Sequence, residues 1–151
     1  VVSWAKLISL INNHKKSREM KKATLKQQEQ QAKQIQNEAL VRLMLLARYQ
    51  DKKLSLSEQD AFNRSLQKIA WSSVTDVSMF TMREIAAVRK ALETPEKTEA
   101  FINQECKAFT SSEAKNECLN VLKHIATADK SDPRENHFLH QVEMALGMVS
   151  A

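Results

Sequence analysis

The stretch LVRLMLLA, residues 40–47, decides the fold class of this chain. Seven of its eight residues are apolar, so the segment must enter a hydrophobic core. It continues residues 17–38, which are rich in Lys, Gln and Glu and contain no Gly or Pro that would stop a helix. The sequence therefore predicts one long helix whose solvated first part changes into a buried second part.

The composition agrees with a helical protein. The chain has 151 residues, 42% hydrophobic and 27% charged, which is typical of one ordinary globular domain. It holds two Pro and a single Gly, Gly147. Tight β-hairpins, dinucleotide-binding motifs and phosphate loops all need more glycine than this. We expect an all-α fold, a compact multi-helix bundle with a long, basic N-terminal helix.

The starts of the later helices are marked by polar residues. Four pairs have the spacing of a capping box, namely Ser55 with Glu58, Thr81 with Glu84, Thr110 with Glu113 and Asp132 with Glu135. Thr94 and Asp132 each precede a proline, which is well suited to the first helical position. The predicted helices span 56–72, 78–92, 95–109, 112–128 and 133–147, with Gly147 as a possible C-terminal cap.

Apolar spacing within these helices predicts the core. We expect largely buried side chains at Leu40, Leu43, Leu46, Phe62, Leu66, Ile69, Leu119, Leu122, Ile125, Phe138 and Val142. Trp71, Met79, Phe80 and Met82 are interpreted as packing residues too.

The positive charge is concentrated at the N-terminus. The whole chain has a net charge of +5, whereas residues 1–36 carry eight Lys or Arg against two Glu, a net charge of +6. The remaining residues are close to neutral, so the folded domain is not expected to bind nucleic acid. We interpret residues 1–37 as a basic amphipathic arm and residues 38–151 as the domain.

The opening VVSWAKLISLI has eight apolar residues in eleven, too few for a membrane span. Two interpretations stay open: Trp4, Leu7, Ile8 and Ile11 pack on the domain, or the segment is the inner end of an anchor that continues upstream, since the chain does not begin with Met. Separately, we predict that an anionic surface, most simply the cytoplasmic leaflet, is contacted by Trp4, Lys15, Lys16, Arg18, Lys21, Lys22 and Lys26. The alternative for these basic residues is a solvated helix face.

Two segments of the chain share one pattern. LMLLARYQDKKLSLSEQDAFNRSLQKI, residues 43–69, runs from an apolar helix end through an acidic loop to a small cap, a Glu and an amphipathic helix. LNVLKHIATADKSDPRENHFLHQVEMALGM, residues 119–148, repeats that order and ends near Leu146 and Gly147. Over about residues 38–150 this arrangement resembles the TerB-like family of bacterial helical domains, found in tellurite-resistance TerB and DjlA-type proteins.

The chain departs from the family pattern in its loops. Lys52 and Lys130 stand where the family usually has Gly, and Lys does not adopt positive φ as readily. The apolar stretch and basic segment before the domain also resemble membrane-anchored J-domain co-chaperones that carry a TerB-like domain. This chain has no J-domain signature.

The resemblance implies that the two acidic loops approach each other as a polar site. Their acidic residues are Asp51, Glu58, Asp129, Asp132 and Glu135. Clustered carboxylate oxygens suit hard cations, so calcium or magnesium is the possible cofactor. Helix capping explains the same residues without a metal, and neighbouring Lys and Arg side chains offset most of their charge.

An enzyme would need a nucleophile beside a base, or paired carboxylates in a pocket. The sequence indicates neither arrangement. His137 and His140 lie three residues apart on one predicted helix and could chelate a metal, but ordinary surface histidines have the same spacing. Cys106 and Cys118 flank a predicted turn, where a disulfide is possible, and two buried thiols are the preferred interpretation.

We therefore expect a non-enzymatic bacterial TerB-like module that acts through protein-protein contacts in a stress-response or membrane-associated context. The alternative is a divalent-cation sensor that uses the acidic loops. A protein partner is expected, an anionic membrane surface is a further candidate, and nucleic acid is not expected. The expected location is the cytoplasm, including the cytoplasmic face of the inner membrane.

Overall fold

The computed structural model describes residues 3–50, 55–128 and 133–148, without the side chains of residues 133–135. Within these ranges the chain forms six α-helices and no strand, which confirms the predicted all-α fold. The helices are α1 (Trp4–Tyr49), α2 (Leu56–Gln67), α3 (Val77–Ala91), α4 (Pro95–Cys106), α5 (Ser112–Ala126) and α6 (Pro133–Ala145). The chain divides into two units, Val1–Lys33 and Gln34–Ala151, and each is described by itself.

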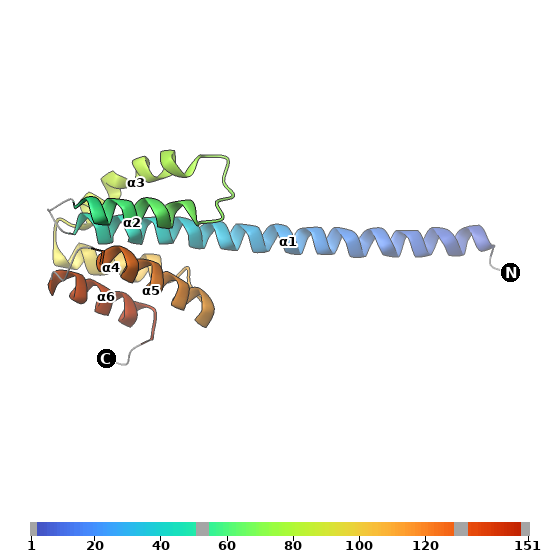
Figure 1. The fold of residues 1–151 in the computed structure, drawn as a ribbon. Coiled ribbons are helices and arrows are strands. Elements are labelled where there is room, and N and C mark those ends of the chain that lie inside the picture. Colours follow the sequence, from blue (N-terminus) through green and yellow to red (C-terminus); the bar gives the residue numbers. More distant parts are fainter. Residues whose placement is uncertain (1–2, 51–54, 129–132, 149–151) are drawn as a thin grey trace. The chain divides into compact units, whose positions relative to one another are not determined.

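The second unit is built around the last part of α1. Figure 1 shows α2 to α6 gathered around this part of the helix. The apolar run predicted from residues 40–47 is buried on nearly every side, and Val41, Leu43, Met44 and Leu46 have no exposed surface. A helix that is apolar all round is stable only when other helices cover it, which α2 to α6 do. In the same unit α4 packs against α3 and α6, and α5 packs against α2 and α6.

The predicted core is largely confirmed. Eight of the eleven predicted core residues are buried, and the exceptions, Leu40, Leu66 and Ile69, are half-buried against the core. Phe80 is buried and Trp71 is half-buried, as expected. The interpretation of Met79 and Met82 as packing residues is wrong, because both lie on the exposed side of α3.

Two of the predicted helix caps are confirmed. The Ser55 hydroxyl accepts a hydrogen bond from the Glu58 N–H at 3.1 Å, and the Thr94 hydroxyl accepts one from the Lys97 N–H at 3.1 Å. Each bond satisfies a backbone donor in the first turn that has no partner within its helix. Gly147, with φ of 73°, follows the end of α6 as predicted. There the Met148 N–H donates to the Glu143 carbonyl at 3.0 Å, as in a Schellman motif.

Two predicted caps are wrong. Helix α3 begins at Val77, where the Asp76 carboxylate accepts a hydrogen bond from the Ser78 N–H at 3.2 Å, so Thr81 lies inside the helix. Helix α5 is capped by Ser111 and not by its neighbour Thr110. In both cases another good capping residue lies nearby. The spacing to the following Glu did not show which of the two candidates is the cap. The fourth predicted pair, Asp132 with Glu135, lies outside the described residues and side chains.

Helix α2 ends at Gln67, five residues before its predicted end. Polar side chains of α1 hold the following connector in place. The Asn37 side-chain amide donates to the Ala70 carbonyl at 2.9 Å, and the Gln34 side-chain oxygen accepts from the Ser72 N–H at 2.9 Å. These bonds satisfy backbone groups that a longer α2 would have paired internally, so the chain leaves the helix early.

Candidate functional site

The first unit presents one long exposed helix surface. With about 100° between successive residues, Trp4, Ile8 and Ile11 lie on the same side of α1. Lys15 and Lys22 continue that side toward the C-terminal end of the unit. One face of the helix therefore changes from apolar to basic along its length. This face is called the docking face below and is formed by Trp4, Ile8, Ile11, Lys15, Arg18 and Lys22.

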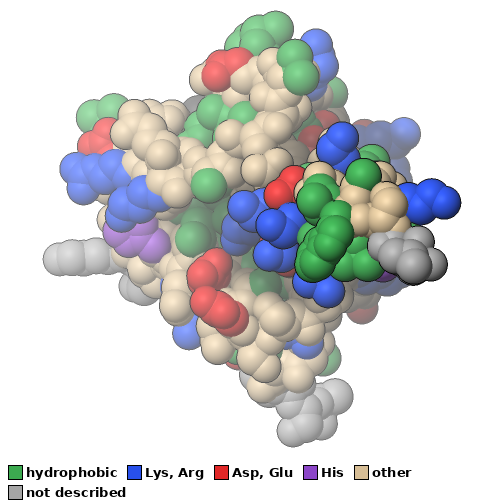
Figure 2. Space-filling view, turned by 90° about the vertical axis from the view of Figure 1, so that its right-hand side faces the viewer, with side chains coloured by type: hydrophobic (Ala, Val, Ile, Leu, Met, Phe, Trp, Pro, Cys, Tyr) green, Lys and Arg blue, Asp and Glu red, His purple; other side chains and the backbone are tan. Residues whose placement is uncertain are grey.

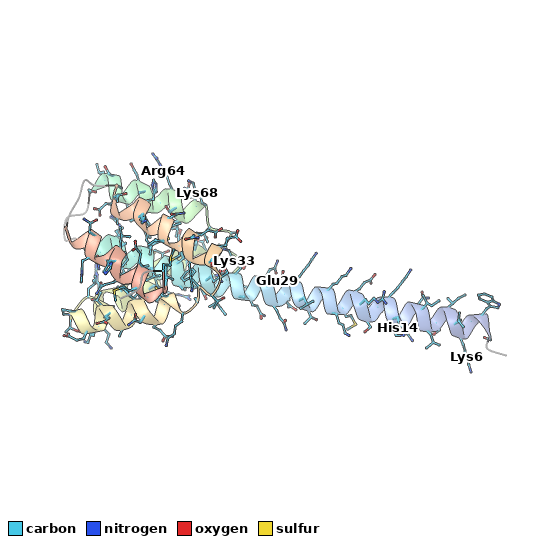
Figure 3. The ribbon with its side chains drawn as sticks, turned by 90° about the horizontal axis from the view of Figure 1, so that it is seen from below. Lys6, His14, Glu29, Lys33, Arg64 and Lys68 are labelled. Carbon is cyan, nitrogen blue, oxygen red and sulfur yellow. The ribbon has the colours of Figure 1, made fainter. Side chains whose placement is uncertain are left out.

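All of the residues predicted to contact an anionic surface lie on this helix and are exposed, namely Trp4, Lys15, Lys16, Arg18, Lys21, Lys22 and Lys26. Trp4 is 80% exposed, and Leu7, Ile8, Leu10 and Ile11 are exposed as well. Figure 2 shows hydrophobic side chains beside Lys and Arg side chains at the start of α1. In Figure 3 the labelled side chains of Lys6, His14 and Glu29 point outward from the same helix.

The sequence identified most of the docking face but not its order. It identified the basic run and the apolar opening as separate features. Helical geometry joins them, because Ile11, Lys15, Arg18 and Lys22 follow one another at intervals of three and four residues. None of the helices among the described residues is long and apolar enough to cross a bilayer.

Most of the predicted cation site cannot be placed. Asp51, Asp129 and Asp132 lie outside the described residues, and so does the side chain of Glu135. Glu58, in the first turn of α2, is only 2% exposed. Its N–H forms the capping hydrogen bond with Ser55. The structure thus shows that Ser55 caps α2 through the Glu58 backbone N–H. The role of the Glu58 carboxylate and the binding of calcium or magnesium stay predictions.

A charged cluster that the sequence did not predict lies in the second unit. The Arg42 guanidinium of α1 donates to Glu84 of α3 at 3.3 Å and to Glu105 of α4 at 3.2 Å. It also lies 5.3 Å from the centre of the Phe80 ring. Burial raises the pKa of the Glu105 carboxyl, and the positive charge of Arg42 offsets part of that rise. The cluster ties α3 and α4 to α1.

A sequence signal for this cluster exists. Arg42 is the only charged residue in the apolar run 40–47, and a charge in that position needs a partner when the helix is buried. Its partners are 42 and 63 residues away, so spacing within one helix could not identify them.

The two thiols are free and buried, as preferred from the sequence. Burial raises the pKa of Cys106 to about 12 and raises that of Cys118 as well. A protonated, enclosed thiol is a poor nucleophile. Neither cysteine has the environment of a reactive site.

His137 and His140 line a shallow groove of about 340 Å³ between α4 and α6. Glu99 and Asn103 of α4 form its other wall. Among the described residues no three His, Cys, Asp or Glu side chains are grouped so that they could hold a metal ion. Both histidines are exposed, and metal binding by this pair stays untested.

The comparisons with known proteins agree with this architecture. The model of one family, the tellurite resistance protein TerB, matches residues 37–151. No curated protein matches the chain, and no solved structure does. The match covers the helices that carry the buried core and leaves the docking face outside it. Because it spans well over half of the sequence, the chain belongs to the TerB family.

Proposed function

We propose that this protein is a non-enzymatic TerB-family module that works at the cytoplasmic face of a bacterial inner membrane in a stress response. In this proposal the docking face holds the protein at an anionic lipid surface, and residues 34–151 bind a protein partner. The observation that carries the proposal is the succession of apolar and basic side chains along one exposed face of α1.

The order of side chains suits a bilayer surface. Trp and large aliphatic side chains partition into the headgroup and acyl boundary, while Lys and Arg stay at the level of anionic headgroups. Each basic residue near such a surface contributes about 1 kcal/mol to binding. Residues 1–36 contain only two acidic residues, Glu19 and Glu29, so little of this attraction is cancelled.

The same features disfavour nucleic acid as the partner. A basic helix that binds DNA or RNA mainly through charge places its cations along the phosphates, and these contacts do not use exposed aliphatic side chains. Here Trp4, Leu7, Ile8, Leu10 and Ile11 come before the basic run that starts at Lys15, and all five are exposed. Burying them in lipid removes apolar surface from water, which stabilises the bound state.

The test is co-sedimentation of the full chain with vesicles of phosphatidylglycerol and phosphatidylcholine, compared with phosphatidylcholine alone. We expect binding to the anionic vesicles that weakens as salt is added. In a Trp71→Phe variant the fluorescence of Trp4 should shift to the blue on binding. Equal absence of binding to both vesicle types would overturn the proposed surface contact.

Matched variants test whether one face is responsible. Lys15→Glu with Lys22→Glu reverses two charges on the docking face, and Lys6→Glu with Lys16→Glu makes the same charge change on other sides of α1. We expect the first pair to weaken vesicle binding by at least about tenfold and the second pair to weaken it much less. Equal effects of the two pairs would show that total charge, not the face, determines binding.

The second candidate function is a divalent-cation sensor. One observation favours it: the Glu58 side chain, a hard oxygen ligand, is buried directly after residues 51–54. Calorimetric titration of chelator-treated protein with calcium and with magnesium, alongside an Asp129→Asn variant, decides the matter. A heat signal that the variant loses would support the sensor. No heat and no melting shift at millimolar metal would overturn the sensor.

A further inference from the structure

The outer side of α3 presents a narrow apolar stripe. Met79 is 52% exposed and Met82 is 69% exposed, and Ala86 is exposed one turn further along. The three residues follow one another at intervals of three and four, so they lie on one side of the helix. Hydrophobic side chains are visible at the upper edge of the molecule in Figure 2, where α3 and the connector before it lie.

Basic side chains flank this stripe. Arg83 and Lys90 lie along one side of it, seven residues apart, and both are exposed. Three acidic residues lie in the same region. Asp76 caps the start of α3 on the side of Arg83, and Glu84 pairs with Arg42 on the inner side of the helix. Glu93 accepts a hydrogen bond from Lys97 at 2.6 Å and also interacts with Lys90. The outer side of α3 therefore has an apolar stripe with the two cations Arg83 and Lys90 beside it.

The inner side of α3 is held in place. Its Phe80 ring lies 5.0 Å from the Trp71 ring, and the Arg42 guanidinium covers the same Phe80 ring. Val88 and Ala91 are buried in the core. Because these contacts fix the helix, its outer side is presented without a rearrangement that would weaken binding.

We propose that the outer side of α3 binds an acidic amphipathic helix of a partner protein. The partner's apolar side covers Met79, Met82 and Ala86, and its carboxylates pair with Arg83 and Lys90. Methionine suits such contacts because its side chain adapts to the shape of the bound surface. In this arrangement two helices pair side by side, with apolar residues along the seam and charged residues next to it. The inference rests on the proposed protein-binding role of residues 34–151 and names the class of partner.

The test uses the full chain and a designed, fluorescently labelled helical peptide with Leu along one side and Glu along its flanks. A peptide with Gln in place of every Glu is the control ligand. Fluorescence anisotropy should show that the Glu peptide binds and that the Gln peptide binds at least about fivefold more weakly. No binding of the Glu peptide, or equal binding of both peptides, would overturn the inference.

Variants of the protein locate the contact. Arg83→Glu with Lys90→Glu, and separately Met79→Ser with Met82→Ser, should each weaken peptide binding by at least about fivefold. Arg64→Glu with Lys68→Glu makes the same charge change on exposed residues at the end of α2 (Figure 3) and should change binding by less than about twofold. An equal loss in this control pair would show unspecific attraction and contradict the proposal.

The docking face of α1 is basic as well, so it needs its own control. If Lys15→Glu with Lys22→Glu abolishes peptide binding while the α3 variants do not, the peptide binds α1 and the inference is wrong. Vesicle binding should be unchanged in the α3 variants, so the two proposals fail independently. If the chain dimerises and Met79→Ser with Met82→Ser abolishes the dimer, the partner on this side of α3 is a second copy of the chain. That result would also overturn the inference.

Discussion

The two parts of helix α1 differ in almost everything except backbone conformation. Residues 4–33 bury none of their side chains, whereas residues 34–49 contribute nine buried side chains to the second unit. In the first part most of the large apolar residues lie near the start, with Met20 and Leu25 further along, whereas the second part has an almost unbroken apolar run at 40–47. Helix propensity alone accounts for neither pattern, because good helix formers populate both parts.

The comparison shows that the side chains of one helix can have two different roles, one in each part. In residues 34–49 the side chains specify packing, and substitutions there change the free energy of unfolding. In residues 4–33 the side chains specify a surface, and substitutions there should change binding and leave the fold intact. The following predictions test this separation, beginning with the largest expected effect.

Thiol reactivity should separate the two units most strongly. Burial raises the pKa of Cys106 to about 12, so only a minute fraction of it is thiolate at pH 8. A Ser17→Cys variant places an ordinary thiol on the exposed part of α1. We expect a disulfide reagent to label this introduced thiol at least about 100-fold faster than Cys106 and Cys118, until denaturant exposes the native thiols. Rates within about tenfold of one another would contradict the buried placement.

Truncation of a leucine should have opposite consequences in the two parts of α1. Leu43 has no exposed surface, whereas Leu25 is 57% exposed. Leu43→Ala should lower the free energy of unfolding by about 2 to 5 kcal/mol because it leaves a cavity. Leu25→Ala should change it by less than about 0.5 kcal/mol. Urea denaturation measures both, and similar losses in the two variants would remove the distinction.

Arg42 is the charged residue on which the buried part of α1 depends. Arg42→Met leaves Glu84 and Glu105 facing each other without a cation, and we expect a loss of about 2 kcal/mol at pH 7. Glu105→Gln should be much milder, since an amide can still accept the hydrogen bond from Arg42. Denaturant titrations of both variants measure the difference, and an equal loss would contradict the assigned role of Arg42.

The pH dependence of the Arg42→Met variant follows from the raised pKa of Glu105. A carboxyl with a raised folded-state pKa stabilises the protein below its unfolded pKa and loses that contribution as pH rises through the folded value. Without Arg42 the pKa of Glu105 rises further, so the destabilisation should be smaller at pH 4 than at pH 7. A loss that does not depend on pH over this interval would show that Glu105 does not contribute to it.

Helix caps should show the smallest difference. Ser111 caps α5 in the second unit, and Ser3 accepts a longer hydrogen bond, 3.4 Å, from the Lys6 N–H at the start of α1. Ser111→Ala should lower the free energy of unfolding by about 1 kcal/mol. Ser3→Ala should leave it unchanged and reduce only local helicity. Thr110→Ala serves as the neighbouring control, and a loss equal to that of Ser111→Ala would reassign the cap.

Much of the fold was predictable because its signals are local. The apolar run at 40–47, the Ser55 and Thr94 caps and the apolar spacing of α5 each depend on residues within a few turns. The errors have the same origin. Thr81 and Thr110 have the right spacing to a Glu, but the helices are capped by Asp76 and Ser111. Which of two nearby candidates becomes the cap depends on where the chain leaves the preceding turn.

The functional surfaces were only partly predictable. The basic residues of α1 are visible in the sequence because they are concentrated in one segment. The contacts of Arg42 are not visible, since its two partners come from other helices. Met79 and Met82 were placed in the core because a methionine at helical spacing does not reveal which side of the helix is covered. Only the packing of Phe80 and Val88 shows that these methionines face outward.

Hydrogen–deuterium exchange of the full chain, with and without phosphatidylglycerol vesicles, tests the separation of roles along α1 most directly. Without vesicles the amides of residues 34–49 should exchange slowly, at a rate set by the free energy of global unfolding. The amides of residues 4–33 should exchange much faster. Vesicles should slow exchange in residues 4–26 and leave α2 to α6 unchanged. Slow exchange of residues 4–33 without vesicles, or vesicle protection confined to α2 to α6, would contradict this account.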